Sequence, residues 1–338
     1  MKISILVPCH NEEKSIKRCL LSCLNQSKKA DQIVVVNDGS TDKSLEILKK
    51  FKEKITIVNI PVHTTRKSLA QAQGIKKING DLLITTDADT ILDRDFIKNI
   101  IEDFDDPKVV ASAGYVKSIQ DNWLTACRQI DYLIGQEIHR KAQSNINALY
   151  VIPGCAAAYR TKIFKKLILF DHDTLAEDLD FTYKYHEQNL KISYNKKAIV
   201  YTEDPANLYD YVRQLRRWNA GNWQNLLKHY RVLDKPSHAL EHSLTYFEGL
   251  IFPLLILISL FINIKAFLIF YLFNFIIVFG FAIFGAIRDK RLDLFVVAPI
   301  YLFITLIHYF VFIEQFIFEI LLRKNNLIWF KPERKAWI

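Results

Sequence analysis

The sequence predicts an α/β domain with a doubly wound parallel sheet, followed by helices that cross a membrane. Up to about residue 233, short apolar runs alternate with charged segments, as they do in a soluble α/β domain. From about residue 243 onward the chain is almost continuously apolar. A chain of 338 residues has room for both parts.

Four apolar runs predict the parallel strands: ISILV at residues 3–7, QIVVVN at 32–37, ITIVNI at 55–60 and LLI at 82–84. The segments between them predict helices, because apolar residues recur there at helical spacing. Asn11 is the expected N-cap of the first helix, and Cys19 and Cys23 lie on its apolar stripe. This alternation of strands and helices is typical of a doubly wound sheet.

Acidic side chains follow three of the predicted strands. Glu12 comes after the first strand, Asp38 after the second, and Asp87 and Asp89 after the fourth. In such sheets ligands bind at the carboxyl ends of the strands, and ionised carboxylates are costly to bury without a counter-charge. We therefore expect a divalent cation here, Mg²⁺ or Mn²⁺, which binds hard oxygen ligands. The alternative for Asp87 and Asp89 is a solvated turn.

The net charge and the cysteines indicate which partners and which redox environment the protein has. The 45 Lys and Arg against 36 Asp and Glu give a net charge of +9, which suits an anionic membrane face or a phosphorylated substrate. The five cysteines show no paired framework, so reduced thiols are expected. No signal peptide is expected, because the apolar run at residues 3–7 is too short for one.

Six motifs occur in an informative order: VPCHNEE at residues 7–13, VVNDGSTD at 35–42, DAD at 87–89, GCAAAYR at 154–160, AEDLD at 176–180 and QLRRW at 214–218. Together they resemble the inverting family 2 glycosyltransferases, which have the GT-A fold. AEDLD resembles that family's [TS]-E-D motif, with Ala176 replacing the usual hydroxyl residue. The full Q-x-x-R-W resembles the branch of cellulose, chitin, hyaluronan and poly-N-acetylglucosamine synthases. The resemblance covers roughly the first 235 residues.

The resemblance implies a role for each motif in sugar transfer. Asp38 would hold the uridine of a UDP-sugar, Asp87 would touch the nucleotide, and Asp89 would bind the Mg²⁺ or Mn²⁺ that bridges the two phosphates. Asp178 would be the general base for the acceptor hydroxyl, although by position alone it could be a helix cap. Lys67 is a weaker candidate for phosphate, because a lone lysine is usually only solvated. The other implied donor-binding residues are Pro8, Glu12, Gln214 and Arg217, and the implied acceptor-binding residues are Gly154, Glu177 and Trp218.

The Q-x-x-R-W residues are expected on one side of a helix, because positions i, i+3 and i+4 are neighbours. Arg217 can bind a diphosphate through two N–H groups, and Trp218 offers an apolar face for a sugar. The alternative is an amphipathic helix at a membrane surface, with Arg213 and Arg216 facing lipid phosphates. The two interpretations are compatible.

Three apolar segments, at about residues 244–264, 266–287 and 294–322, each reach the roughly 20 residues that a membrane-crossing helix needs. We predict a cytosolic GT-A domain at 1–235, a membrane domain with about three helices at 236–322, and a basic C-terminal tail at 323–338. The protein is thus expected to be a multi-pass cell-membrane protein with its catalytic domain on the cytoplasmic side.

The number of spans stays open in this prediction. Three spans would place the C-terminus outside, whereas the Lys and Arg residues of the tail favour the cytoplasm. Glu314 and Glu319 are costly in lipid and are expected to face a pathway or a partner. The N-terminal spans of several resembling synthases are not expected here.

The sequence therefore predicts a membrane-bound inverting transferase that moves a sugar from a UDP-sugar to a growing glycan, processively and with a β linkage. Expected partners are the UDP-sugar, a glycan or lipid-linked acceptor and membrane lipids, and no nucleic acid. The alternative is a non-processive transferase acting on a lipid-linked or glycolipid acceptor. A catalytically silent membrane component is disfavoured because Asp89, Asp178 and Trp218 are all present. A nucleotidyltransferase is disfavoured because VPCHNEE offers no glycine-rich phosphate loop.

Overall fold

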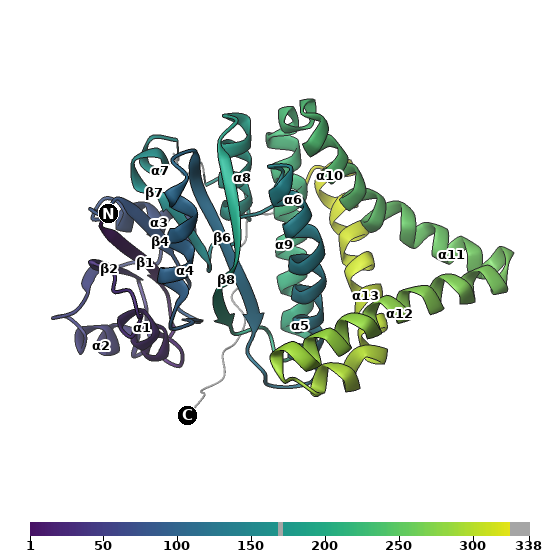
Figure 1. Cartoon of the computed structure of the whole chain (residues 1–338), viewed down its shortest axis with the longest axis horizontal. Helices are drawn as coiled ribbons and strands as arrows, with labels where there is room; N and C mark the ends of the chain where they lie inside the picture. Colours follow the sequence, from purple (N-terminus) through teal and green to yellow (C-terminus); the bar gives the residue numbers. More distant parts are fainter. Residues whose placement is uncertain (168–171, 325–338) are drawn as a thin grey trace. The chain divides into compact units, whose positions relative to one another are not determined.

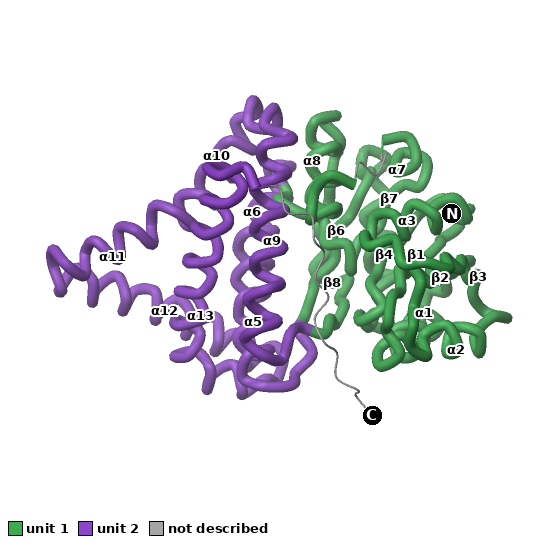
Figure 2. Tube along the Cα trace, turned by 180° about the vertical axis from the view of Figure 1, so that it is seen from behind, with its two compact units in different colours: residues 1–117, 149–203, 333–338 green, residues 118–148, 204–332 purple. Residues whose placement is uncertain are grey.

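The computed structural model of the chain describes residues 1–167 and 172–324 (Figure 1). These residues form two compact units (Figure 2). The first unit contains residues 1–117 and 149–203, and the second contains residues 118–148 and 204–324. The predicted boundary at residue 235 stays a prediction. The predicted basic tail at 323–338 lies outside the described residues from residue 325 onward.

The first unit is built on a mixed sheet with the strand order β3-β2-β1-β4-β7-β6-β8-β5. The four predicted strands form its parallel half: β1 (Ile3–Cys9), β2 (Gln32–Asp38), β3 (Thr56–Ile60) and β4 (Leu82–Thr85). The remaining strands are β5 (Thr90–Leu92), β6 (Val109–Ser118), β7 (Ala157–Arg160) and β8 (Lys191–Thr202). β7 runs antiparallel to both β4 and β6, and β8 runs antiparallel to β5. The predicted α/β class is confirmed, with an antiparallel extension.

Helices follow the strands of the first unit: α1 (Ile16–Leu24), α2 (Ser44–Lys49), α3 (Lys67–Ile75), α4 (Phe96–Ile101), a 3₁₀ turn (Glu102–Asp105), α7 (Thr161–Leu167) and α8 (Glu177–Glu187). β2 is buried on both faces, as the β-branched run QIVVVN predicts. On one face of the sheet, Leu6 and Val36 pack in a core with Ala70 of α3, Phe164 of α7 and Phe181 of α8. Three helices therefore cover this face.

Asn11 does not cap the first helix. α1 begins at Ile16, and its N-cap residue is Ser15. Asn11 instead adopts a left-handed backbone with φ of 51°, and its side-chain oxygen accepts a hydrogen bond from the backbone N–H of Thr41 at 2.7 Å. The predicted cap was wrong because the carboxamide of Asn11 connects the loops that follow β1 and β2.

The second unit is helical. Its elements are α5 (Trp123–Ile134), a π-helical turn (Gly135–Arg140), α6 (Lys141–Asn145), α9 (Leu208–Lys228), a 3₁₀ turn (Tyr230–Asp234), α10 (Pro236–Tyr246), a π-helical turn (Phe247–Ile251), α11 (Phe252–Ile262), α12 (Ile264–Asp289), α13 (Asp293–Phe316) and a last π-helical turn (Ile317–Leu321). One core joins four of these helices, with Ile130 from α5, Leu215 from α9, Val278 from α12 and Val297 from α13.

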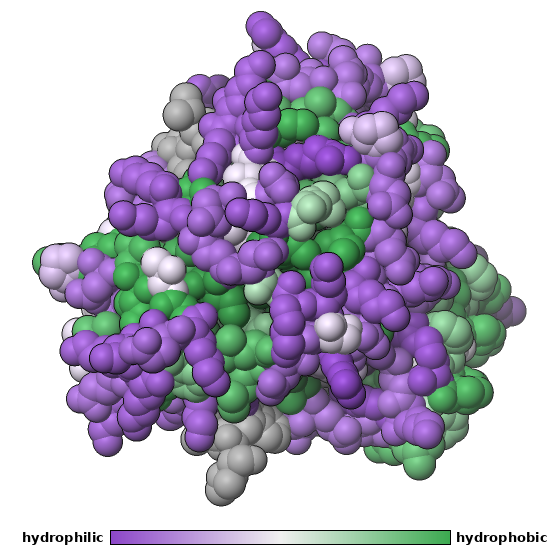
Figure 3. Space-filling view, turned by 60° about the vertical axis from the view of Figure 1, so that its left-hand side comes forward, coloured by the Kyte–Doolittle hydropathy of each residue, from purple (hydrophilic) through white to green (hydrophobic). Residues whose placement is uncertain are grey.

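Three helical stretches of the second unit are long and apolar enough to cross a membrane: Pro236–Ile262, Ile264–Asp289 and Asp293–Leu321. They overlap the three predicted segments, and the most apolar 18-residue window of each has a mean hydropathy of 2.1, 2.6 and 2.2. Among the described residues of the first unit, the exposed large apolar side chains are limited to Met1, Leu21 and Val62. Most of the others lie on these three stretches. The space-filling view shows one face with hydrophilic side chains over much of it and separate exposed apolar areas (Figure 3).

Gly80 provides a test of the packing between the start of β4 and β1. A Cβ added at Gly80 would lie 2.7 Å from the backbone nitrogen of Ser4, which cannot move without disturbing β1. We expect Gly80→Ala to lower the free energy of unfolding by about 1–3 kcal/mol, as overpacking does. The measurement is the thermal unfolding midpoint of the detergent-solubilised protein.

Gly135→Ala is the matched control, because no atom of the described residues outside its own helix backbone and chain neighbours lies within 4 Å of its added Cβ. Alanine also favours helix over glycine, so this variant should unfold at the same temperature or a higher one. Equal midpoints for Gly80→Ala and the wild type would contradict the described packing.

Candidate active site

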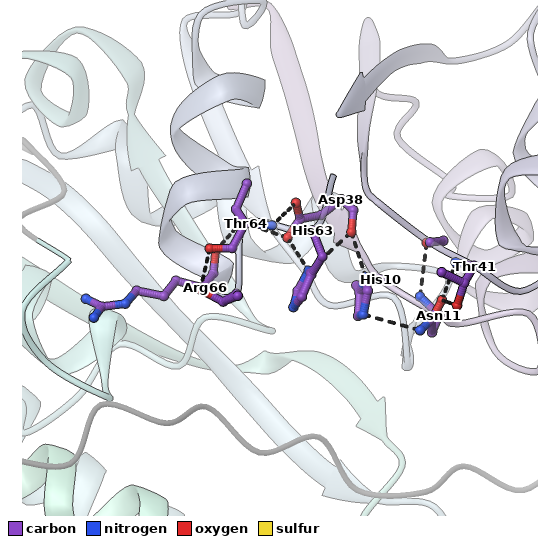
Figure 4. A network of polar contacts seen from close by, with 9 residues as sticks. His10, Asn11, Asp38, Thr41, His63, Thr64 and Arg66 are labelled. Atoms are coloured by element: carbon purple, nitrogen blue, oxygen red, sulfur yellow. Dashed lines mark hydrogen bonds and ion pairs between the residues drawn. The ribbon is translucent and has the colours of Figure 1, made fainter. Parts of the chain in front are cut away.

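Asp38, at the end of β2, is held by the segment that follows β3 (Figure 4). Its Oδ1 accepts a hydrogen bond from the backbone N–H of Thr64 at 2.9 Å, and its Oδ2 accepts one from the Thr64 hydroxyl at 2.8 Å. His63 Nδ1 lies 3.0 Å from the same Oδ2. The carboxylate predicted to hold uridine is thus fixed in place. A carboxylate has about four lone-pair sites, so it can still accept from a ligand.

Two imidazole rings stack beside this carboxylate. The ring centroids of His10 and His63 are 3.6 Å apart, and His10 Nδ1 lies 2.6 Å from the backbone oxygen of Asp38. Gly39 makes this approach possible, because its φ is +59° and an added Cβ would lie 2.2 Å from the backbone nitrogen of His63. The loops after β1, β2 and β3 therefore meet around Asp38 (Figure 4).

Pro8 and Glu12 lie in and after β1. Pro8 pairs with Val36 in the sheet register. The Glu12 carboxylate accepts a hydrogen bond from the Ser15 hydroxyl at 2.5 Å, and its backbone N–H donates to the Ser44 hydroxyl at 2.7 Å. These contacts hold the loop at the start of α1. The donor-binding role of both residues stays a prediction.

Lys67 is the positive charge among the carboxylates of the first unit's site. Its ammonium lies 2.7 Å from Asp87 Oδ1 and 3.2 Å from Glu177 Oε1. Burial lowers the pKa of Lys67, but the charges of Asp87 and Glu177 outweigh this effect and hold the pKa well above its ordinary value. Burial raises the pKa of Asp87, while Lys67 opposes that rise. The ammonium is thus charged at neutral pH and partly offsets these two half-buried carboxylates.

The sequence contains a stronger signal for Lys67 than its prediction as a weak phosphate candidate used. Lys67 opens α3, directly after the carboxyl end of β3, which is the same edge of the sheet that carries the acidic motifs. Sequence reasoning also missed His63 and Thr64, because no motif marked the loop after β3.

Asp178 lies in the first turn of α8, next to Glu177. Its Oδ2 is 3.4 Å from the backbone nitrogen of Gly154, and its Oδ1 accepts from the backbone N–H of Leu179 at 3.0 Å. A helix cap needs only contacts to its own helix, whereas Asp178 also contacts the backbone of Gly154. A Cβ added at Gly154 would lie 3.3 Å from the Lys67 ammonium and 3.8 Å from the Asp178 Cβ, so the small residue lets these groups approach.

Tyr159 contributes a neutral phenol to the same region. Burial and the charge of Asp178 raise the pKa of Tyr159, so its hydroxyl stays protonated. A small pocket brings its ring together with Thr85, Gly154, Glu177 and Asp178. The structure thus joins the DAD, GCAAAYR and AEDLD motifs in one place in the first unit.

Asp89 fits the predicted metal ligand by its chemistry. It is 8% exposed and precedes β5, and its Oδ1 accepts a hydrogen bond from the Thr90 hydroxyl at 3.2 Å. Within residues 1–167 and 172–324, no group of three or more His, Cys, Asp or Glu side chains is arranged to hold a metal ion. A Mg²⁺ or Mn²⁺ ion bound by one or two carboxylates and a substrate diphosphate does not need such a cage.

The three Q-x-x-R-W residues lie on α9 of the second unit. Gln214 is buried there, whereas Arg217 and Trp218 are half-buried. The guanidinium of Arg128 lies over the indole of Trp218, 4.6 Å from the ring centroid. Sequence reasoning missed Arg128, because none of the six motifs includes it.

The carboxylates of the last apolar segment have partners inside the second unit. Arg216 Nε lies 2.7 Å from Glu314 Oε2, so Arg216 contacts this carboxylate. The alternative in which Arg216 faces lipid phosphates stays a prediction. Gln224 donates a hydrogen bond to Glu319 at 3.2 Å. Both glutamates thus face a partner, as their cost in lipid predicts.

Part of the chain is similar to a known protein family. Residues 4–168 match the model of the glycosyl transferase family 2. Over these residues the chain is similar to family 2 glycosyltransferases. The resemblance inferred from the six motifs is thereby confirmed, and the carboxyl-edge residues Asp38, Asp87 and Asp89 all lie within the matched part.

The transferase domain also has curated relatives. The poly-β-1,6-N-acetyl-D-glucosamine synthase of Staphylococcus epidermidis is 28% identical over 231 residues, which are 68% of this chain and 56% of that protein. The synthase of the same name from Staphylococcus aureus strain COL is 29% identical over 233 residues, again 68% of this chain and 56% of the relative. The chain thus spans just over half the length of the relatives it matches.

A solved structure supports the fold. A mannosyltransferase from Pyrobaculum calidifontis, in complex with GDP-Man and Mn²⁺, superposes with a TM-score of 0.60 at 20% identity, covering 73% of this chain and 70% of the other. The predicted GT-A-like fold of the transferase domain is therefore confirmed.

The contact between Lys67 and the carboxylates can be tested through stability. Lys67→Met leaves Asp87 and Glu177 without their counter-charge, so we expect it to lower the free energy of unfolding by about 3 kcal/mol. Adding Asp87→Asn to this variant removes one of the unpaired charges and should recover part of the loss. Thermal unfolding of the four proteins of this double-mutant cycle gives the coupling energy.

Lys76→Met is the control for this cycle. Lys76 is exposed, follows the other end of α3 and contacts Gln73 at 2.9 Å. It should change the unfolding midpoint little. A coupling energy near zero between Lys67 and Asp87 would contradict the contact.

Proposed function

We propose that the chain is a membrane-bound inverting glycosyltransferase that transfers a sugar from a UDP-sugar to the end of a growing glycan. The observation that carries this proposal is the position of Lys67, which joins Asp87 to Glu177 beside Asp178. The names of the curated relatives support N-acetylglucosamine as the transferred sugar. The Q-x-x-R-W motif supports a processive reaction.

The surroundings of Asp38 favour uridine as the base of the donor. Guanine presents two adjacent N–H groups, which pair best with both oxygens of one carboxylate. Here Thr64 donates to both oxygens of Asp38, and His63 lies against Oδ2. Uracil has a single ring N–H to place and requires only one remaining acceptor position. We therefore propose UDP-N-acetylglucosamine as the donor.

The diphosphate would lie at the edge where Lys67 and Asp89 are found. The Lys67 ammonium offers a fixed positive charge to the leaving phosphates, and fixed charges of this kind are strong contributors to catalysis. Asp89 would hold a Mg²⁺ or Mn²⁺ ion, which supplies Lewis-acid stabilisation of the departing diphosphate. Asp87 would contact the nucleotide, with Pro8, Glu12, Gln214 and Arg217 as further donor contacts.

Asp178 would act as the general base. It accepts the proton of the acceptor hydroxyl as that oxygen bonds to C1 of the sugar and the bond from C1 to the diphosphate oxygen breaks on the opposite side. Attack from the opposite side inverts the α configuration of the donor and leaves a β linkage. Gly154 leaves space for the acceptor, and Glu177 and Trp218 would contact it.

The three apolar helical stretches support a multi-pass protein of the cell membrane. We propose that the transferase domain lies on the cytoplasmic side, where UDP-sugars are made. The second candidate function is non-processive transfer to a lipid-linked acceptor. The observation that favours it is the exposed apolar surface of α11 and α12, which a lipid tail could cover.

The length of the product separates these two functions. Membranes containing the protein are incubated with labelled UDP-N-acetylglucosamine and Mg²⁺ or Mn²⁺. A processive enzyme makes long chains while most acceptors stay unextended. Products that are always one sugar longer than the acceptor would leave only the non-processive function.

Asp178→Asn tests the general base. We expect kcat to fall by at least about 10³-fold, within the range that proton transfer by a positioned side chain contributes together with orientation. Donor binding should be retained, because the amide preserves size and the contact with Gly154. Asp180→Asn is the matched control on the same helix, since Asp180 pairs with Lys184 at 2.8 Å. Near wild-type transfer by Asp178→Asn would contradict the assignment.

Metal removal tests the role of Asp89. Treatment with a chelator should abolish transfer, and added Mg²⁺ or Mn²⁺ should restore it in the wild type. Asp89→Ala should not recover at the metal concentration that restores the wild type, because the protein ligand is gone. Full activity of metal-free Asp89→Ala would remove metal assistance from the mechanism.

A further inference from the structure

Arg128 is a buried arginine of the second unit that the proposed mechanism does not use. Arg128 is 4% exposed. Its guanidinium carbon lies 4.9 Å from the ring centroid of Tyr132 and 5.7 Å from that of Tyr211. The third ring is the indole of Trp218 at 4.6 Å. Arg128 and Tyr132 come from α5, and the other two rings come from α9. Three aromatic rings thus surround one cation.

Two carboxylates hold this cation. Arg128 Nη1 lies 2.8 Å from Asp131 Oδ2, and its Nε lies 3.6 Å from Asp204 Oδ1. The hydroxyl of Tyr132 donates a hydrogen bond to Asp204 Oδ1 at 3.0 Å. Burial lowers the pKa of Arg128, but Tyr132 and Asp131 outweigh this effect and raise it well above its ordinary value. The guanidinium is therefore charged and cannot turn freely.

The same network reaches α13. The hydroxyl of Tyr301 donates to Asp131 Oδ1 at 2.6 Å, and the hydroxyl of Tyr211 lies 3.4 Å from Asp131 Oδ2. Tyr211 also contacts His308 of α13. The position of Arg128 is thus set by residues from three helices.

Such a network is expensive to bury. Removing a cation and two carboxylates from water carries a penalty of several kcal/mol per ion, and apolar residues of similar volume often pack as well or better. Helix packing alone therefore does not explain these charges. Trp218 stays half-exposed in this network, and its ring is covered by the guanidinium.

We propose that Arg128 is a positioning residue that holds the Trp218 indole in the plane that receives the acceptor sugar. A cation over the face of tryptophan is among the stronger cation–π arrangements, especially when it is desolvated. An indole already held in its bound orientation loses less freedom when a sugar packs on it, so the acceptor binds more tightly. The proposal rests on the proposed function, in which Trp218 binds the acceptor.

The test uses the full-length protein in detergent, UDP-N-acetylglucosamine and a soluble β-1,6-linked N-acetylglucosamine oligosaccharide as acceptor. Arg128→Met should raise the acceptor KM about tenfold, the effect of losing a desolvated cation–π contact. The kcat and the donor KM should stay within about twofold, because Arg128 touches neither the donor nor the reacting atoms. Arg128→Lys keeps a cation over the ring and should restore most of the acceptor affinity.

Folding is controlled by two further variants. Arg128→Met combined with Asp204→Asn removes one carboxylate together with the cation, so it leaves less unpaired charge in the interior. Arg288→Met is the matched control, because Arg288 also lies over a ring, 5.0 Å from the Phe284 centroid, and pairs with Asp289 at 2.9 Å. Arg288→Met should leave the acceptor KM unchanged even where it lowers the unfolding temperature.

A second readout does not depend on transfer. The fluorescence of Trp218 is isolated as the difference between each protein and the same protein carrying Trp218→Phe. Loss of the covering cation in Arg128→Met should make this emission more accessible to acrylamide, and Arg128→Lys should reverse the change. Arg288→Met should not alter it.

The outcomes separate this proposal from the proposed function. Failure of the wild type to extend the oligosaccharide would argue against the function, while the fluorescence of Trp218 would still test the positioning. An unchanged acceptor KM with unchanged Trp218 quenching in Arg128→Met overturns the proposal. So does an equal loss of kcat and of both affinities in the Arg128 variants, because that pattern indicates a structural role alone.

Discussion

The ion pair between Lys67 and Asp87 is the contact on which the arrangement of the first unit's site depends. It links the start of α3 to the loop after β4, and through Glu177 it also reaches the start of α8. The carboxylates of Asp87, Glu177 and Asp178 repel one another, and the nearby Lys67 ammonium offsets this repulsion. Gly154 completes this arrangement, because a larger side chain there would press on the ammonium.

Most of the parallel half of the sheet could be predicted because β1, β2 and β4 are buried on both faces and consist largely of apolar residues. The antiparallel half could not. β8 reads KISYNKKAIVYT, with lysines and an asparagine in its middle, and its pairing with β5 joins segments about a hundred residues apart. Asn11 shows the limit of a local rule, since its preference for capping a helix lost to hydrogen bonds with the loop after β2.

The motif residues of the site could be predicted for a similar reason. Asp38 and Asp87 directly follow strands, so the topology alone brings them to one edge. Thr64 and Arg128 are different, because nothing near them in the sequence reveals their partners. Asp204 and Trp218, which contact Arg128, lie 76 and 90 positions after it in the sequence. From the sequence alone, a lone charged residue is usually expected to be solvated. Sequence patterns report local periodicity and cannot report such distant pairs.

The polar contacts along α9 have a mechanical consequence. Arg216 pairs with Glu314, Tyr211 contacts His308, and Gln224 bonds to Glu319, so α9 is fastened to the last apolar stretch over several turns. A helix in a bilayer adjusts its tilt to the thickness of the hydrocarbon layer. Any such tilt of α13 would be carried to Trp218 by these fastenings. The lipid composition around the protein would then influence the angle of the Trp218 indole.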